Sequence, residues 1–414
     1  MVNVLFALSV ILSILVFIFI SFIFIVVIIG LFKGKDYKNF EPKLSVVIPT
    51  YNEEKNIGRC IDSILNSNYN KNRIEIIVVD DSSKDKTADI VKKYKFVRLI
   101  KQPHLGKSEV LNKGFKTAKN DFILVIDADT IIERDFIKEI VNPFSDKKVG
   151  AVTGIIKVKN KGLLPTFQNV EYSFYNLIRH SFSSVFRNSV WFLGALACYR
   201  KKVVKETGLF KKDTMTEDLD LAMEMNRKGY RNISIAKAVG YTNVPKNFKE
   251  LFLQRYRWWI GGLQSVFKNK DLVSFKYGVP LIFLFVNQVF WSVYSIIYLP
   301  LLVYQFNYWL PYNIYNIGAF IVYTVRWFSL WGPIYVVYNL PKNGFSAFTF
   351  FGVITGILVT IMLLMALKLF KYKFKIKDYI AIFFFFPYTI VLNIIVLASL
   401  FTSLFSKKRY FKKE

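Results

Sequence analysis

The first 32 residues of the sequence contain no charged side chain. At about 1.5 Å of rise per residue, a helix of this length would cross the roughly 30 Å hydrocarbon core of a bilayer. A cleaved secretory signal would have a basic leader, a shorter apolar core and a small-residue cleavage site, and none of these is present. We therefore expect residues 1–32 to form an uncleaved transmembrane helix.

A second apolar block covers residues 278–405 and predicts about four further spans, near 279–303, 313–338, 347–369 and 379–405. The polar region between the blocks divides into a soluble domain at 33–245 and an interfacial helical segment at 246–277. Lys33, Lys35 and Lys38 directly follow the first span, which favours the cytoplasmic side for the soluble domain. The sequence therefore predicts a multi-pass plasma-membrane protein whose soluble domain and basic tail, 406–414, are cytoplasmic.

The formal net charge of +28 requires acidic partners. No nucleic-acid-binding motif occurs in this membrane-bound chain, so we expect no nucleic acid partner. Anionic lipid headgroups and a phosphate-bearing substrate are the better candidates. Only two cysteines, Cys60 and Cys198, are present, which gives neither a disulfide framework nor a metal cluster and suits a reducing compartment.

The soluble region alternates apolar strand patterns, at 44–50, 74–81, 96–102 and 121–129, with helical patterns. This alternation predicts an α/β domain with a mostly parallel sheet covered on both faces, whose ligands bind beyond the carboxyl ends of the strands. Polar residues stand at three of the four ends: Thr50, Asn52 and Glu53; Asp80 and Asp81; Asp127 and Asp129. The alternative is that these residues only form turns and helix caps.

One of these ends, together with a lysine that follows the third strand, suggests phosphate chemistry. Asp127 and Asp129 are spaced to hold a hard divalent cation, which would in turn bind a diphosphate. Gly106-Lys107-Ser108 looks like the end of a Walker A loop, but Lys101 stands where its first glycine is required. A P-loop is therefore excluded, and the lack of a G-x-G-x-x-G motif excludes a dinucleotide site. Lys107 is either a phosphate-binding cation or a solvated surface lysine.

The segment "TEDLDLAMEMNRKGY", which ends at Tyr230, begins a predicted helix. Thr214 and Glu217 fit a capping box, but four acidic residues between positions 213 and 220 exceed what capping needs. One carboxylate at this helix start could serve as a general base toward a hydroxyl.

Further along, "QRYRWW" places Gln254, Arg257 and Trp258 on one helical face, with Arg255 and Trp259 on a neighbouring stripe. The alternative is an amphipathic helix at the membrane surface, for which Trp and Arg are typical. Both roles are compatible if one stripe faces the membrane surface and the other faces the soluble domain.

Together these segments resemble the membrane-integrated processive polysaccharide synthases of glycosyltransferase family 2, which make hyaluronan, poly-N-acetylglucosamine, chitin or cellulose. The resemblance covers about residues 43–262 and rests on "VVIPTYNEE", "VVDDSSKDKT", "GKSEVLN", "DADT", "TED" and "QRYRW" in the family's order. It implies a glycosyltransferase A-type fold and an inverting, metal-dependent transfer from a UDP-sugar, with Mg²⁺ or Mn²⁺ as cofactor.

The resemblance also implies roles for particular residues. Asp218 would be the general base, with Glu217 beside it as a second catalytic candidate. Asp127 and Asp129 would bind the metal. The UDP-sugar would be contacted by Thr50, Tyr51, Glu53, Asp80, Asp81, Lys107, Asp127 and Arg257. The acceptor would lie against Gln254, Trp258, Gly194 and Trp191.

Three functions remain open at this point. The first is addition of a hexose or N-acetylhexosamine to a growing polysaccharide, coupled to translocation through the membrane. The second is a single transfer to a lipid acceptor such as a polyprenyl phosphate or a glycolipid. The third, an inactive transporter-like membrane protein, is disfavoured by the intact D-x-D, "TED" and Q-x-x-R-W motifs.

Overall fold

The computed structural model describes residues 2–34, 37–309, 317–318, 321–322, 325, 329–344, 347–371 and 375–405. Among them, four helices contain segments long and apolar enough to cross a membrane: Val4–Phe32, Val279–Val303, Phe350–Leu369 and Phe385–Phe405. They belong to α1 (Val2–Phe32), α10 (Val279–Trp309), α13 (Ala347–Leu369) and α15 (Phe385–Phe405). The N-terminal helix and three of the C-terminal helices are thus confirmed.

The remaining C-terminal predictions need two qualifications. The span predicted at 313–338 is described only in part, at 317–318, 321–322, 325 and 329–338, and its last residues belong to α12 (Trp331–Asn343). The span predicted at 379–405 is interrupted, because α14 (Ile376–Phe383) ends at Phe383 and Phe384 separates it from α15.

The polar region folds around an eight-stranded sheet with the order β3-β2-β1-β4-β7-β6-β8-β5. The strands are β1 (Leu44–Thr50), β2 (Ile74–Asp80), β3 (Val97–Lys101), β4 (Phe122–Ile126), β5 (Ile131–Ile132), β6 (Val149–Val158), β7 (Leu196–Arg200) and β8 (Arg231–Thr242). The first four strands pair in parallel, as predicted. β6 and β8 also pair in parallel, whereas β7 pairs antiparallel with β4 and β6, and β5 pairs antiparallel with β8. The sheet is therefore mostly parallel, as predicted, with β7 and β5 as its antiparallel strands.

Helices cover both faces of this sheet because successive strand residues point to opposite sides. In β1, Leu44, Val46 and Ile48 pack into one core, with α2 (Ile57–Leu65) and α5 (Phe136–Val141). Val47 packs into the core on the other face. That face is covered by α4 (Lys107–Thr117), α7 (Lys201–Glu206) and α8 (Glu217–Arg227), while the short α3 (Thr87–Lys92) lies against α2 and β3.

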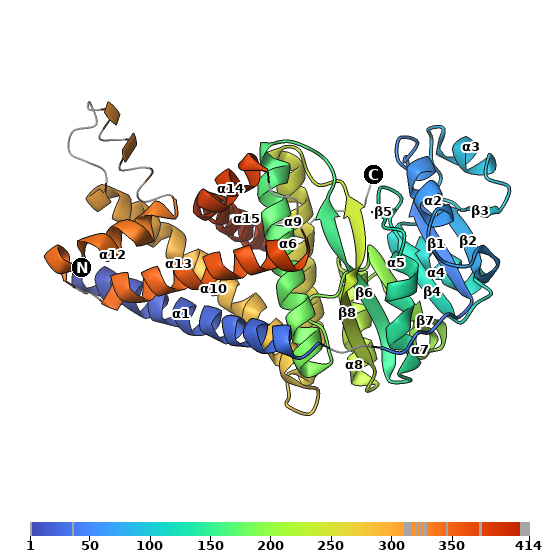
Figure 1. Cartoon of the computed structure of the whole chain (residues 1–414), viewed down its shortest axis with the longest axis horizontal. Coiled ribbons are helices and arrows are strands. Elements are labelled where there is room, and N and C mark those ends of the chain that lie inside the picture. Colours follow the sequence, from blue (N-terminus) through green and yellow to red (C-terminus); the bar gives the residue numbers. More distant parts are fainter. Residues whose placement is uncertain are drawn as a thin grey trace.

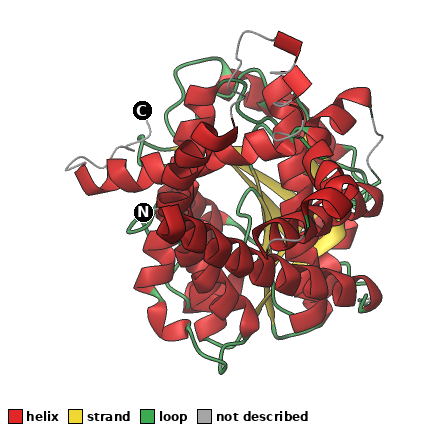
Figure 2. Ribbon diagram, turned by 90° about the vertical axis from the view of Figure 1, so that its left-hand side faces the viewer, coloured by secondary structure: helices red, strands yellow, loops and turns green. Residues whose placement is uncertain are grey.

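Two long helices, α6 (Leu163–Phe186) and α9 (Phe248–Lys268), stand between the sheet and the apolar helices (Figure 1). α6 packs against α1, α13 and β6, and α9 packs against α8, α10 and α15. Seen from the end that carries the apolar helices, the strands lie behind the helices (Figure 2). Helices α6 and α9 therefore both contact the soluble domain and the apolar helices.

Candidate active site

Carboxylates from neighbouring strand ends converge at one edge of the sheet, as the sequence predicts. β1 lies between β2 and β4, so the residues after β1 and β4 meet at the same edge. Burial, followed by the charges of Asp127 and Glu53, raises the pKa of Asp129 to about 6. Thr242 Oγ1 also donates a hydrogen bond to Asp129 Oδ2 over 3.2 Å. Three acidic side chains thus concentrate negative charge at this point.

Lys107 brings a positive charge into this acidic cluster. Gly106 precedes α4 with a φ of 88°, a left-handed conformation that glycine adopts without strain, and Lys107 is the first residue of the helix. Its Nζ lies 2.8 Å from Asp127 Oδ1. Burial lowers the pKa of Lys107, but the carboxylates of Asp127 and Glu217 outweigh burial and raise it. The lysine is therefore a charged site residue and not a solvated surface one.

The second strand end has a structural role in addition to the one that the resemblance implies. The carboxylate of Asp81 accepts hydrogen bonds from the backbone amides of Leu105 and Gly106, each 3.0 Å long. The same carboxylate lies 2.9 Å from His104 Nδ1 and accepts from Gln102 Nε2 over 2.8 Å. Asp81 thus fixes the loop that delivers Lys107. Its contact with the nucleotide stays a prediction.

The other predicted nucleotide residues border this loop. Asp80 Oδ1 accepts a hydrogen bond of 3.0 Å from the Ser83 amide. The ring of Tyr51 lies 4.6 Å from that of His104, centroid to centroid, so the two form an aromatic surface beside the acidic cluster. Thr50 is buried, and its Oγ1 has no hydrogen-bond partner among the described residues. These positions are compatible with a nucleotide but do not by themselves identify one.

Asp218 is held at the start of α8 by two backbone amides. Gly194 N–H donates to its Oδ2 over 2.7 Å, and Leu219 N–H donates to its Oδ1 over 2.9 Å. Burial and the neighbouring Glu217 raise the pKa of Asp218 to about 6, against the opposing effect of Lys107. A carboxylate with this pKa is charged at neutral pH and basic enough to take a proton from a hydroxyl in the transition state.

The capping box that the sequence suggested for this helix is not formed. Thr216 is the N-cap and makes no side-chain capping bond, and Thr214 Oγ1 has no partner among the described residues. The four acidic residues instead divide by role. Glu217 and Asp218 face the site, whereas Asp213 and Asp220 bind Lys268 Nζ at 2.8 and 2.7 Å.

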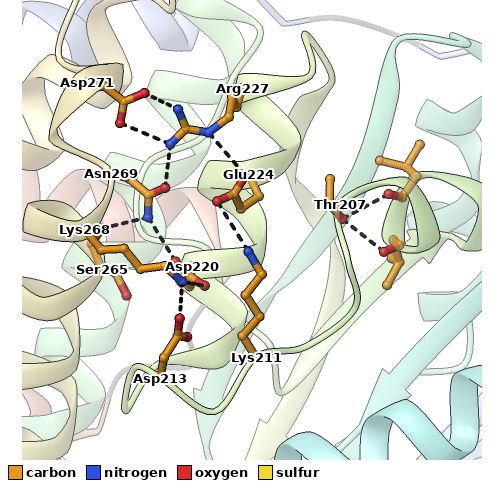
Figure 3. Close-up of polar contacts among 12 residues, drawn as sticks. Thr207, Lys211, Asp213, Asp220, Glu224, Arg227, Ser265, Lys268, Asn269 and Asp271 are labelled. Carbon is orange, nitrogen blue, oxygen red and sulfur yellow. Dashed lines mark hydrogen bonds and ion pairs between the residues drawn. The ribbon is translucent and has the colours of Figure 1, made fainter.

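A polar network joins α8 to the end of α9 around Asp220 (Figure 3). Asp220 is buried, and its other oxygen accepts from Asn269 Nδ2 over 2.9 Å. Asn269 Oδ1 accepts from Arg227, which also pairs with Asp271 and Glu224. Sequence reasoning missed this network, because the partners of Asp220 lie about fifty residues away in the chain. The network fixes α8, which carries Asp218, relative to α9, which carries Arg257.

On α9, the structure separates the two predicted stripes. The pKa of Lys107 is affected most by burial, then by the carboxylates of Asp127 and Glu217, and then by the charge of Arg257, which lowers it. Arg257 therefore lies on the side of α9 that faces the candidate active site. Trp258 is 36% exposed and lies 6.2 Å from the Tyr172 ring. Gln254 is partly buried next to them. The predicted grouping of arginine and tryptophan at the site is thus consistent with the geometry.

The neighbouring stripe does not face the membrane surface, which corrects the sequence interpretation. Arg255 is buried and forms an ion pair of 2.8 Å with Glu171 on α6. Trp259 Nε1 donates to Ser292 Oγ of α10 over 3.2 Å. The stripe packs against other helices because its polar atoms find partners there, and helical periodicity alone does not reveal these partners.

The loop before β7 carries the two other residues that are predicted to contact the acceptor, Gly194 and Trp191. Gly194 lies against Asp218, where a Cβ atom would come within 2.6 Å of Oδ2. Trp191 has a φ of 49° and packs edge-on against Tyr175 at 5.3 Å and against Phe283 of α10 at 5.8 Å. This loop therefore contacts both the candidate base and one of the apolar helices.

The donor set fits a divalent cation that is shared with a substrate. Among the described residues, no group of three or more His, Cys, Asp or Glu side chains could hold a metal. Asp127 and Asp129 alone offer the one or two carboxylates that Mg²⁺ usually takes from a protein when phosphate oxygens complete its coordination. The two carboxylates lie close together: after burial, the charge of Asp127 is the largest cause of the raised pKa of Asp129.

Comparisons with known proteins agree with this geometry. A family model described as "Glycosyl transferase family 2" matches residues 45–208. The poly-beta-1,6-N-acetyl-D-glucosamine synthase of Staphylococcus aureus (strain COL) is 30% identical over 267 residues, 62% of this chain and 64% of that protein. The probable glycosyltransferase YdaM of Bacillus subtilis (strain 168) is 33% identical over 238 residues, 55% of this chain and 57% of that protein. The match with this chain thus spans less than two thirds of each of these relatives.

A solved structure shows the same fold over nearly the whole chain. The mannosyltransferase PcManGT from Pyrobaculum calidifontis, in complex with GDP-Man and Mn²⁺, superposes with a TM-score of 0.61 and 18% sequence identity. The superposition covers 98% of this chain and 100% of that chain. It confirms the glycosyltransferase A-like α/β fold. At this identity it shows the fold alone.

Proposed function

We propose that this chain, in which residues 45–208 match a model of glycosyltransferase family 2, transfers a hexose or N-acetylhexosamine from a UDP-sugar to a growing polysaccharide with inversion. The name of the S. aureus relative favours UDP-N-acetylglucosamine as the first donor to test. The domain would work at the cytoplasmic face of the plasma membrane, between the N-terminal helix and the C-terminal apolar helices. Anionic headgroups would lie against the basic residues that follow α1.

One observation carries this proposal: a carboxylate with a pKa of about 6, raised mainly by burial, stands at a helix start beside a cationic and acidic cluster. Asp218 is fixed by the amides of Gly194 and Leu219, so its oxygens are aimed before any substrate arrives. Lys107 and Arg257 lie on the same side. This is the combination that a displacement with a negatively charged leaving group needs.

The chemistry follows from these positions. Asp218 takes the proton of an acceptor hydroxyl while the hydroxyl oxygen forms a bond to the anomeric carbon of the donor. The bond between that carbon and the diphosphate oxygen breaks, and UDP leaves with the bonding electrons. Attack from the face opposite to the leaving group inverts the anomeric configuration. Lys107 and Arg257 stabilise the charge that develops on the diphosphate.

A divalent cation would bind Asp127 and Asp129, and when bound it neutralises part of the diphosphate charge. Without it, these carboxylates would repel the substrate, even though Asp127 pairs with Lys107 over 2.8 Å. The acceptor sugar would lie on the floor formed by Gly194 and Trp191, with the exposed part of Trp258 as a flat apolar wall. Gln254 would complete this wall.

The polymer would leave the site along α9, because this helix contacts both α8, which carries Asp218, and the apolar helices α10 and α15. Processive extension and passage through the membrane are therefore part of the proposal. A single transfer to a lipid acceptor would use the same base and donor site, and product size separates the two reactions.

The test uses the full-length protein purified in detergent, with radiolabelled UDP-N-acetylglucosamine, UDP-glucose, UDP-galactose and GDP-mannose as donors. We expect a long polysaccharide from one UDP-sugar, and formation of this product about 10²- to 10⁴-fold more slowly by Asp218→Asn. A product that is lipid-soluble and carries one sugar would replace the polysaccharide proposal with the lipid one. Absence of transfer from every donor would contradict the function itself.

A further inference from the structure

Arg255 is buried where three helices meet. Its Nη2 donates to Glu171 Oε2 of α6 over 2.8 Å, and Tyr388 Oη of the apolar helix α15 donates to the same oxygen. The exposed fractions of Arg255, Glu171 and Tyr388 are 8%, 4% and 5%. Phe167 of α6 stacks on the Tyr388 ring at 5.4 Å, which holds the phenol in place. Because this ion pair is buried, its hydrogen bonds hold the Arg255 guanidinium in one orientation.

The other side of the same guanidinium contacts the acceptor wall. Arg255 Nη1 donates to Gln254 Oε1 over 2.7 Å, and the guanidinium carbon lies 4.4 Å from the centroid of the Trp258 ring. It also lies 5.6 Å from the Tyr172 ring. A cation over one face of an indole orients the ring and leaves its exposed part free for a ligand. Arg255 therefore touches both side chains of the wall without belonging to it.

We propose that Arg255 is a positioning residue for the acceptor site, and that Glu171 and Tyr388 hold its guanidinium so that Gln254 and Trp258 face the acceptor sugar. Helix α15, one of the apolar helices, thereby takes part in setting the geometry of the catalytic wall. The inference rests on the proposed function, in which this wall binds the acceptor.

Arginine is required here because of its shape. One planar group donates to Glu171 and Gln254 from separate nitrogens while its face lies over Trp258. A lysine ammonium is a compact point charge, and it cannot make both bonds and the stacked contact from one position. If the ion pair served only to stabilise the fold, removal of the Tyr388 hydroxyl would leave the acceptor site unchanged.

The decisive variant is Tyr388→Phe, because it keeps the ring and its stacking on Phe167 and removes one hydrogen bond. Glu171→Gln and Arg255→Lys test the other two members. Tyr230→Phe is the matched control, since Tyr230 Oη donates a 2.9 Å hydrogen bond to an exposed glutamate, Glu206. Steady-state kinetics would use β-1,6-linked N-acetylglucosamine oligomers as acceptor and UDP-N-acetylglucosamine as donor.

We expect Tyr388→Phe to raise the KM for the acceptor about fivefold, with the donor KM changed less than about twofold, and Glu171→Gln to have a larger effect. The emission of Trp258, obtained as the difference from Trp258→Phe in each background, should shift to the red in both variants and stay unchanged in Tyr230→Phe. Arg255→Lys should not restore either property.

An unchanged acceptor KM and an unchanged Trp258 emission in Tyr388→Phe and Glu171→Gln would overturn the inference. Equal increases in both KM values would also overturn it, because they indicate a general loss of structure. If no donor supports transfer, the proposed function fails, and the emission of Trp258 still decides whether the three residues position the wall.

Discussion

The backbone amide of Gly194 donates a hydrogen bond of 2.7 Å to Oδ2 of Asp218. The two residues come from different layers, one from the loop before β7 and one from the first turn of α8. Their contact is possible because position 194 has no side chain: a Cβ atom there would lie 2.6 Å from Oδ2 and 2.7 Å from the Asp218 Cβ. The orientation of the candidate base therefore depends on a glycine in another element.

Gly194→Ala should displace the Asp218 carboxylate. We expect kcat to fall by about two orders of magnitude, since a small misplacement of a catalytic group has effects of that size. The KM for the UDP-sugar should change little, because in the proposed site the donor binds to residues at the strand ends and not to position 194. Steady-state kinetics would check this, with Gly352→Ala as control, where a Cβ meets no atom within 4 Å. A Gly194→Ala variant with the kcat of the wild type would contradict the assignment of Asp218 as the base.

The rate should depend on the ionisation of Asp218. Burial and Glu217 raise the pKa of this carboxyl to about 6, and only its ionised form can accept a proton. Activity should therefore be low below pH 6, rise as the pH passes through about 6, and level off above it. The pH profile of kcat/KM would show this limb. Asp218→Asn should lose about 10²- to 10⁴-fold in rate and with it the limb.

Lys107→Met should weaken donor binding and slow transfer. Lys107 pairs with Asp127, and in the proposed site its loss would remove a positive charge that faces the diphosphate. We expect an increase of about tenfold in the dissociation constant of UDP, measured by titration calorimetry. Lys113→Met is the matched control, because Lys113 lies on the same helix and is exposed. Equal affinities in the two variants would contradict the assignment.

Asp129→Asn should reduce the affinity for Mn²⁺ in the presence of UDP. Two carboxylates would hold the ion, so the loss of one charge should weaken binding by about tenfold or more. Electron paramagnetic resonance of free Mn²⁺ measures this without any turnover. Asp135→Asn, at an exposed position outside the cluster, should bind Mn²⁺ as the wild type does. Activity that is insensitive to EDTA would argue against a metal at this site.

Lys268→Met should destabilise the protein by leaving Asp220 without its cation. The Asp220 side chain is 2% exposed, and Asn269 would remain its only neutral partner among those described. Lys268 is itself partly exposed, so we expect a loss of about 1–3 kcal/mol in the free energy of unfolding. Thermal unfolding in detergent would show a lower Tm for Lys268→Met. Lys270→Met, two residues along the chain and exposed, should unfold like the wild type.

Much of the donor side of the site could be predicted from local sequence patterns. The apolar runs that lead to Thr50, Asp80 and Asp127 form β1, β2 and β4, and the bounds agree within one residue except that β4 ends three residues earlier than predicted. Parallel pairing brings their carboxyl ends to one edge, so polar residues at those ends must meet. The predicted site therefore depends on rules that need no knowledge of long-range contacts.

The errors of the sequence reading share one cause. Thr214 and Glu217 matched a capping box, but α8 begins at Glu217 and its cap is Thr216. Arg255 matched a stripe at the membrane surface, but its partner is Glu171, 84 positions away. Both matches rest on spacing within one helix. Spacing cannot show which other helix supplies a partner.

The sequence by itself determined four apolar helices, the parallel pairing of the first four strands and the residues at the carboxyl edge of these strands. It could do so because hydrophobic periodicity and strand-end position are local properties of the chain. Only the tertiary structure decided that Gly194 holds Asp218, that Lys268 joins α8 to α9, and that Arg255 lies between Glu171 and Trp258. Buried polar groups must find partners when water is removed, and packing of distant elements decides which partners lie within reach.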